Sequence, residues 1–187
     1  MHRFYVDQPI QRPGVTVTLS KEESAHAARV LRLRPGEEVR LLDGQNLWAA
    51  VLDTVDEKAS TVRVQSLCDS PEAPCQAVLF QGLPKADKLE LIVQKGTELG
   101  MHSLWPVEME RSVARMDKAG RDEKKRDRLQ RIALEAAKQS GRAHVPDVAA
   151  AMSFDKALQA MERQPFDLVL VAWEEEHSLP LSQAVRN

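Results

Sequence analysis

The stretch AVLFQGLPKADKLELIVQKGTELGMHSLWPVEM, residues 77–109, decides the fold of this chain. It starts with an apolar run at 77–83, which predicts a buried strand. A helix should follow, because Asp87 and Glu90 have the spacing of a capping box. A second apolar run at 103–109 predicts the next strand. A strand, a helix and a strand in this order are typical of a parallel sheet in an α/β layer fold.

The same alternation continues toward the C-terminus. Apolar faces predict two further helices, over residues 122–140 and 154–163. The run DLVLVAW (167–173) is nearly all apolar, which is typical of a strand buried on both faces of a parallel sheet. Three strands make a small sheet, so we expect residues 77–187 to form an α/β domain that is incomplete at its C-terminal side.

Residues 1–70 have the pattern of a separate domain. Apolar runs with turn residues between them predict strands at 39–43, 47–55 and 60–67. Asp43-Gly44 indicates a hairpin, because glycine accepts the positive φ of a tight turn. We expect a small β barrel here. The segment PEAPCQ (71–76) contains two prolines and predicts the linker between the domains.

One helix accompanies the strands of the first domain. Ser20 and Glu23 form another capping box, so the helix is expected over about 21–33. Its apolar stripe comprises Ala27, Val30 and Leu31.

Positive charge is concentrated in one part of the chain. The whole sequence has 26 Lys plus Arg against 28 Asp plus Glu, a net charge of -2, which excludes a polycation. Residues 111–144, however, hold 11 basic and 5 acidic side chains. Such a run can follow a phosphate backbone, and it can equally be a solvated helix face. Its candidate RNA contacts are Arg111, Lys124, Lys125 and Arg142.

Two smaller basic groups extend this set. His26, Arg29 and Arg32 share one face of the first domain's helix, where ordinary surface charge is the alternative explanation. Lys85 and Lys88 flank the entry into the helix of the β-α-β unit. A helix N-terminus favours a phosphate, although lysines in a loop also serve solubility.

Several function classes lack sequence support. The motifs GxGxxG, GxxxxGK[ST], HExxH and GxSxG are absent, so dinucleotide, nucleotide triphosphate, metalloprotease and hydrolase sites are not indicated. Two cysteines without CxxC spacing indicate neither a disulfide framework nor a metal site. No run is long enough to cross a membrane and no signal peptide is indicated, so we expect a cytoplasmic protein.

Four blocks of sequence also point to a known family. The blocks are HAARVLRLRPGEEVRLLDG (26–44), PKADKLELIVQKGTELG (84–100), ERSVAR (110–115) and ALEAAKQSGRAHVPDV (133–148). In order and spacing they resemble the RsmE family of ribosomal RNA methyltransferases. The resemblance spans residues 1 to about 185 and includes LVLVAWEEE (168–176).

The resemblance implies a PUA-like β barrel that binds RNA, followed by a SPOUT-type parallel α/β domain with a knotted C-terminal chain. It implies a homodimer that transfers the methyl group of S-adenosylmethionine to N3 of one uridine in the 16S rRNA of the small ribosomal subunit. Trp173 and Glu174 lie at the C-terminal end of the predicted last strand, at the edge where α/β folds bind ligands, and are the expected cofactor contacts. The catalytic base is left unassigned, and Arg142 is a candidate for stabilising the uracil or a phosphate.

Members of the resembled family continue with a GPEGG-type loop, a further strand and an LGxxILRxETA-type loop. None of these occurs in the 187 residues. The resemblance implies that they build the knot and most of the cofactor pocket, so we expect a truncated chain that is inactive alone. The alternative, from another class of protein, is a non-catalytic module that binds rRNA.

Overall fold

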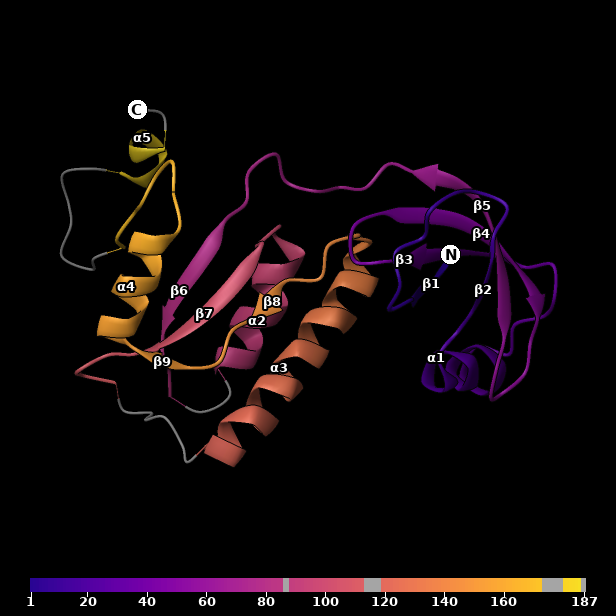
Figure 1. Cartoon of the computed structure of the whole chain (residues 1–187), viewed down its shortest axis with the longest axis horizontal. Helices are drawn as coiled ribbons and strands as arrows, with labels where there is room; N and C mark the ends of the chain where they lie inside the picture. Colours follow the sequence, from indigo (N-terminus) through magenta and orange to yellow (C-terminus); the bar gives the residue numbers. More distant parts are fainter. Residues whose placement is uncertain (86–87, 113–118, 173–179, 186–187) are drawn as a thin grey trace.

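The computed structural model describes residues 1–85, 88–112, 119–172 and 180–185 and contains two sheets joined by a linker (Figure 1). The first sheet is drawn in indigo to magenta and lies beside the C-terminal end of a long helix of the second part. No helix in the described part of the chain is both long and apolar enough to cross a membrane.

The first sheet has five strands in the order β1-β3-β4-β5-β2. They are β1 (His2–Tyr5), β2 (Thr16–Thr18), β3 (Glu38–Leu42), β4 (Leu47–Thr54) and β5 (Thr61–Cys68). β1 runs parallel to β3 and the other pairs are antiparallel. Register shifts after Ala49 and Leu52 bend β4, so the sheet curls around a core that includes the fully buried Phe4 and Leu41. This curled sheet agrees with the small β barrel that the sequence predicted.

Asp43 fixes the predicted hairpin between β3 and β4. One carboxylate oxygen accepts two backbone N–H groups of the turn, and the other accepts Trp48 Nε1–H at 2.8 Å and the Ile10 N–H at 3.0 Å. Gly44 has a φ of 85°, as the turn requires. Burial acts to raise the pKa of Asp43, but the four donors outweigh it and lower this pKa.

The helix of the first domain is confirmed but is shorter than predicted. Ser20 Oγ caps α1 (Lys21–Ala25) by accepting a backbone N–H of its first turn at 3.2 Å. A π-helical turn, η1 (His26–Val30), follows, and the helical path ends at Arg32 with a φ of 54°. A π turn takes in an extra residue and shifts the side chains around the helix axis. Val30 is therefore 71% exposed, and its place in the predicted apolar stripe is wrong.

The second sheet is parallel throughout. Its strands are β6 (Val78–Gly82), β7 (Ser103–Glu108), β8 (Asp147–Val148) and β9 (Met152–Ser153). β7 is central and pairs with the other three. The helices are α2 (Lys88–Glu98), α3 (Ala119–Ser140), α4 (Phe154–Arg163) and α5 (Leu181–Ala184). The first two predicted strands and the two later predicted helices are thereby confirmed, while the short β8 and β9 were not predicted.

The helices α2 and α3 lie on one side of this sheet and α4 on the other (Figure 1). Leu104 of β7 packs in a core with Val93 of α2 and Leu129 of α3. Trp105, the next residue of β7, lies on the side of α4, with its ring tilted by 55° against that of Phe80 of β6 at 4.9 Å between centroids. Successive side chains of β7 thus point to opposite faces of the sheet and contact a layer of helices on each side, as expected for a strand covered on both faces.

The apolar run at 167–173 does not form the predicted strand over its described residues, 167–172. Leu168, Val169, Leu170 and Val171 are between 44% and 86% exposed. A strand needs a neighbour for its backbone N–H and C=O groups, and an apolar pattern does not name that neighbour. β6 pairs with β7, and the described part of the chain gives the run no partner. Only the preceding Phe166 packs on β6, with its ring centroid 6.1 Å from that of Phe80.

Candidate RNA-binding site and domain interface

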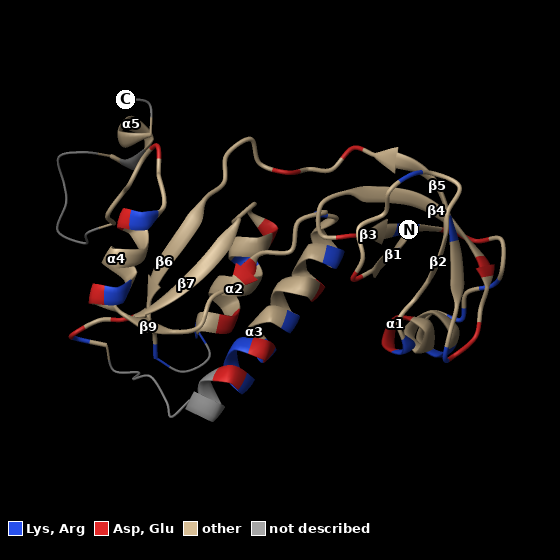
Figure 2. Cartoon of the chain, viewed as in Figure 1, with Lys and Arg blue, Asp and Glu red and all other residues tan. Residues whose placement is uncertain are grey.

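The predicted basic run lies mainly on α3, where positive and negative side chains alternate (Figure 2). Lys124 and Lys125 are exposed, and no ion pair is recorded for either of them within the described ranges. Arg128 forms an ion pair with Glu90 of α2 at 2.9 Å. The N-terminal half of α3 therefore combines cations that are available to a ligand with others that support the fold.

The three predicted contacts of the first domain differ in accessibility. Arg29 is exposed and pairs with Glu57, and Arg32 is exposed just after η1. His26 is half-buried and lies edge-on to Phe4, with ring centroids 6.4 Å apart. Two of the three side chains can therefore reach a ligand without rearrangement.

Lys85, Lys88 and Arg111 are exposed near one edge of the second sheet. β6 ends at Gly82 and β7 at Glu108, so Lys85 and Arg111 each follow the carboxyl end of a parallel strand by three residues. The carboxyl edge is where open α/β sheets bind ligands. The structure thus brings Lys85 and Arg111 to one edge of the second sheet, although they lie far apart in the sequence.

The carboxyl edge also has an apolar floor. Leu83 and Val107 are buried there, and a Cβ on Gly82 would lie only 3.1 Å from Met109 Cγ. The half-exposed Met109 is therefore the apolar side chain that this edge offers beside the exposed Lys85 and Arg111. The predicted cofactor contacts Trp173 and Glu174 lie outside the described residues.

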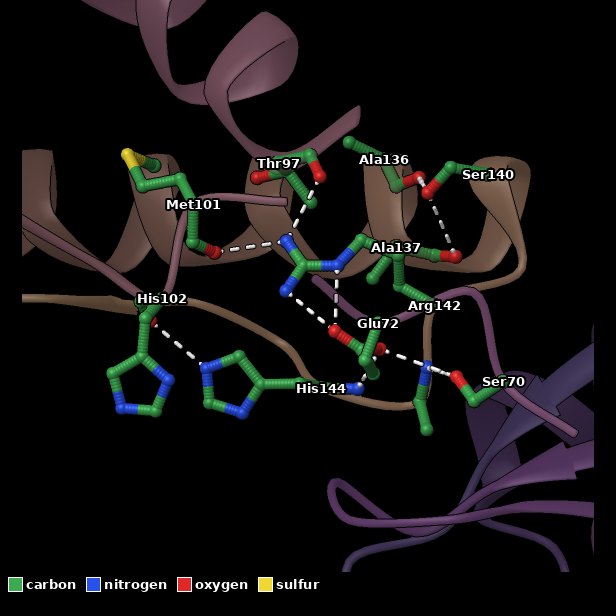
Figure 3. Close-up of polar contacts among 11 residues, drawn as sticks. Ser70, Glu72, Thr97, Met101, His102, Ala136, Ala137, Ser140, Arg142 and His144 are labelled. Atoms are coloured by element: carbon green, nitrogen blue, oxygen red, sulfur yellow. Dashed lines mark hydrogen bonds and ion pairs between the residues drawn. The ribbon is translucent and has the colours of Figure 1, made fainter. Parts of the chain in front are cut away.

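Arg142 is buried, 3% exposed, and it joins the linker to α2 (Figure 3). Its NH1 group donates to the carbonyl oxygens of Thr97 and Met101, at 2.8 Å each. Its Nε and NH2 groups donate to Glu72 Oε2 at 3.1 and 2.8 Å. This geometry leaves no guanidinium surface for RNA, so the predicted contact of Arg142 with a phosphate or the uracil is not retained.

Glu72 of the linker collects four donors. Besides Arg142, it accepts the His144 backbone N–H at 3.0 Å and the Ser70 hydroxyl at 3.2 Å. Burial acts to raise the pKa of Glu72, but these donors, Arg142 foremost, lower it. His102 and His144 stack beside the cluster with ring centroids 4.3 Å apart (Figure 3). Burial, then His144 and Arg142, lowers the pKa of His102.

Lys138, near the C-terminal end of α3, is buried between the two domains. Its ammonium group donates to Glu23 Oε1 at 2.8 Å, and both side chains are 9% exposed. Burial acts to lower the pKa of Lys138, but Glu23 and then Glu135 raise it. Arg3 of β1 donates to the carbonyl oxygens of Lys138 and Gln139, at 3.0 Å each. Sequence reasoning placed Lys138 in the exposed basic run and missed this role.

A cleft of about 650 Å³ separates α1 from α3. Its charged lining has more acidic than basic side chains: Asp7, Glu22, Glu23, Asp127 and Glu135 against Lys21, Arg131 and Lys138. An RNA that touches both domains would therefore place its phosphates on the rims of this cleft and not along its floor.

Family models match both parts of the chain. Residues 71–186 match a model described as an RNA methyltransferase domain. Residues 19–65 match a model described as an RNA methyltransferase PUA domain.

Named relatives agree with these matches. The chain is 36% identical over 179 residues to ribosomal RNA small subunit methyltransferase E of Bacillus subtilis (strain 168), covering 94% of this chain and 69% of the relative. It is 32% identical over 152 residues to the protein of that name from Synechocystis, covering 81% of this chain and 48% of the relative. The chain thus spans about two thirds of the first relative and about half of the second.

Solved structures share the fold. A crystal structure of ribosomal RNA small subunit methyltransferase E from Neisseria gonorrhoeae, bound to S-adenosyl methionine, has a TM-score of 0.77 and 32% identity, covering 86% of this chain and 66% of that one. A putative methyltransferase from Legionella pneumophila, in complex with the same cofactor, has a TM-score of 0.74 and 30% identity, covering 84% and 65%. With a methyltransferase model over more than half of its length and a 36% identical relative, the chain belongs to the RsmE family of ribosomal RNA methyltransferases.

Proposed function

We propose that this protein binds the 16S rRNA of the small ribosomal subunit and serves the S-adenosylmethionine-dependent methylation of one uridine at N3. The observation that carries the proposal is the joining of a PUA-like sheet to a methyltransferase domain within one matched chain. The relatives' names support rRNA of the small subunit as the substrate class. The matches favour a methyltransferase over the alternative of a purely RNA-binding module.

The described residues fit one part of a site for the methyl donor. Bound S-adenosylmethionine would supply the electrophilic methyl group, as two solved relatives hold this cofactor. Met109 offers an exposed apolar side chain at the carboxyl edge of the sheet, and Lys85 and Arg111 offer exposed cations there. Trp173 and Glu174 remain proposed contacts. Since the chain spans 69% or less of the two named relatives, the activity of a whole enzyme is part of the proposal.

The protein's own residues have two tasks in this reaction. They hold the RNA, mainly through phosphate contacts from exposed cations of both domains. They would also bring N3 of the uracil in line with the methyl carbon at about 3 to 3.5 Å. The N–C bond would form as the methyl–sulfur bond breaks, S-adenosylhomocysteine would leave, and the N3 proton would pass to a base or to solvent. A cation near the uracil oxygens would stabilise the charge that develops there.

Family membership supports three further parts of the proposal. The chain divides into an RNA-binding domain at 1–70, a linker at 71–76 and a methyltransferase domain at 77–187. The protein acts as a homodimer, and it acts in the cytoplasm, where ribosomal subunits are made.

Methylation is tested on small subunits from cells that lack this modification. The protein is expressed from its entire reading frame and incubated with these subunits and S-adenosylmethionine. The rRNA is then digested and examined by mass spectrometry. We expect one N3-methyluridine per subunit. Subunits that are bound but unmodified would support the purely RNA-binding alternative.

RNA binding by the first domain is tested separately. Arg29→Glu plus Arg32→Glu should weaken binding of labelled rRNA helices and reduce its dependence on salt, because fewer counterions are released. Arg12→Glu plus Arg63→Glu is the matched control, since it reverses two exposed arginines of the same domain outside the proposed surface. Equal affinities of the first variant and the parent at every salt concentration would show that this domain does not hold RNA through these arginines.

A further inference from the structure

One short segment makes all the recorded polar contacts between the two domains. Within the described ranges, every hydrogen bond that joins residues 1–76 to the rest of the chain ends on residues 138–144. This segment, which we call the pivot, comprises the last turn of α3 and the loop after it. Ala143 of the pivot also packs with Leu42 and Leu47 of the first sheet. The angle between the domains therefore depends on a single helix end.

Lys138 and Glu23 form the buried ion pair of this pivot. Both side chains are 9% exposed, and Glu23 Oε1 also accepts the Tyr5 backbone N–H at 3.3 Å. The other oxygen of Glu23 is buried, with no hydrogen-bond partner recorded in the described part of the chain. A buried ion pair contributes little net stability, and the best-attested use of such pairs is to specify one register. A buried pair between residues of the two domains is therefore suited to specify one arrangement of them.

The same helix connects the pivot to the proposed RNA surface. Lys124 and Lys125 lie 14 and 13 residues before Lys138 on α3, a distance of about 20 Å along the helix axis. Arg29 and Arg32 follow α1, the helix that begins two residues before Glu23. Fixing Lys138 against Glu23 therefore fixes the spacing between the two basic surfaces.

We infer that Lys138 is a positioning residue, which through Glu23 holds the RNA-binding domain and the methyltransferase domain in the one register that lets both basic surfaces engage the same RNA. The inference rests on the proposed function. Two linked surfaces bind one RNA with an effective concentration that depends on their spacing. If the spacing varies, each surface still binds phosphates, but the two act together less often.

The test replaces the ion pair without leaving an unpaired charge in the interior, since Glu135, the second partner of Lys138 at 3.3 Å, is 58% exposed. Lys138→Met alone would bury the Glu23 carboxylate without its partner and threaten folding. Glu23→Gln plus Lys138→Met keeps the side-chain volumes and an acceptor for the Tyr5 N–H. The matched control is Lys95→Met plus Glu98→Gln, which removes the 2.7 Å ion pair within α2 of one domain. Circular dichroism establishes that both variants are folded.

The first readout is the distance between the domains, independent of RNA. Spin labels are placed at the exposed residues Lys58 and Gln159, with Cys68 and Cys75 changed to Ser. We expect a narrow distribution of label distances in the parent and the control and a broad one in the variant. A distribution that stays narrow in the variant would overturn the inference.

The second readout is titration of an rRNA helix at several salt concentrations. We expect the variant to bind about tenfold more weakly than the parent, with an unchanged salt slope, because no phosphate contact is lost. Unchanged affinity, or a slope reduced by about 1 as for a lost phosphate contact, would contradict the positioning role. If the parent binds no rRNA, the proposed function fails, and the label distances alone then decide whether Lys138 sets the register.

Discussion

The two ends of α3 carry the same kind of side chain and have opposite roles. Lys124 and Lys125, near the start of the helix, are exposed, and no ion pair is recorded for them among the described residues. Lys138, near its end, and Arg142, just after it, are buried and bind carboxylates of the first domain and the linker. Basic residues in one run of sequence thus divide into a surface for a ligand and a joint between domains.

The neighbours of each cation account for this difference. Ala133 packs in the core of the second domain, and Ala136 and Ala137 are buried near it, so this part of α3 is covered by its own domain while Lys138 meets Glu23 of the first. Residues 123–128, around Lys124 and Lys125, are all charged and exposed. Burial of a cation requires a partner for its charge, and Glu23 and Glu72 supply one each.

The largest effect is expected for Arg142→Met. The change leaves the Glu72 carboxylate without its cation and two carbonyl oxygens without donors, so the free energy of unfolding should fall by about 3 kcal/mol. Urea denaturation measures this loss. Lys124→Met, at the exposed end, should change stability by less than about 0.5 kcal/mol. Similar losses in the two variants would remove the distinction between the ends of α3.

A smaller loss is expected for Gly141→Ala. Gly141 has a φ of 79°, and a Cβ there would lie 3.0 Å from the Arg3 guanidinium. Backbone strain and displacement of Arg3 together should cost about 2 kcal/mol in thermal or urea unfolding. Gly14→Ala is the matched control, because Gly14 has a φ of 84° and open space around it. If both variants lose the same stability, Arg3 does not hold the helix end.

Glu72→Gln should lower stability at neutral pH and also change the response to acid. Because the pKa of Glu72 is lowered in the folded protein, its contribution is present above its unfolded pKa of about 4.3 and is lost as the pH falls through the folded value. Gln keeps an acceptor but leaves the buried Arg142 without a counter-charge, so we expect the variant to lose about 2 kcal/mol at pH 7 and to have a flatter stability profile below pH 4.3 than the parent. Parallel profiles would show that Glu72 is not held by Arg142.

Local patterns in the sequence predicted most of the elements. The run at 77–83 became β6 because the next apolar run, 26 residues on, supplies a parallel neighbour within the same β-α-β unit. The equally apolar run at 167–172 has no such neighbour in the described part of the chain and stays exposed. Hydrophobicity predicts that a segment is to be buried, but pairing decides whether it is.

The candidate site was harder to predict than the fold. Charge indicated the exposed lysines of α3 and the arginines beside α1, which the structure leaves accessible. It could not show that Lys138 and Arg142 face carboxylates 115 and 70 residues away in sequence. The buried Ala136 and Ala137 gave no signal for Lys138, because residues one and two positions apart do not share a helix face. Nor could the sequence show that the Glu23 carboxylate, predicted to complete a capping box, pairs with Lys138 of the second domain instead.

The claim that the exposed end of α3 binds RNA, while its buried end joins the domains, is tested most directly by the salt dependence of rRNA binding. Labelled rRNA helix is titrated with the parent and with Lys124→Gln plus Lys125→Gln at several salt concentrations. We expect the variant's slope of log affinity against log salt to be shallower by about 2, since two phosphate contacts are lost. A variant whose slope equals that of the parent would contradict the assignment of the exposed end of α3 to RNA.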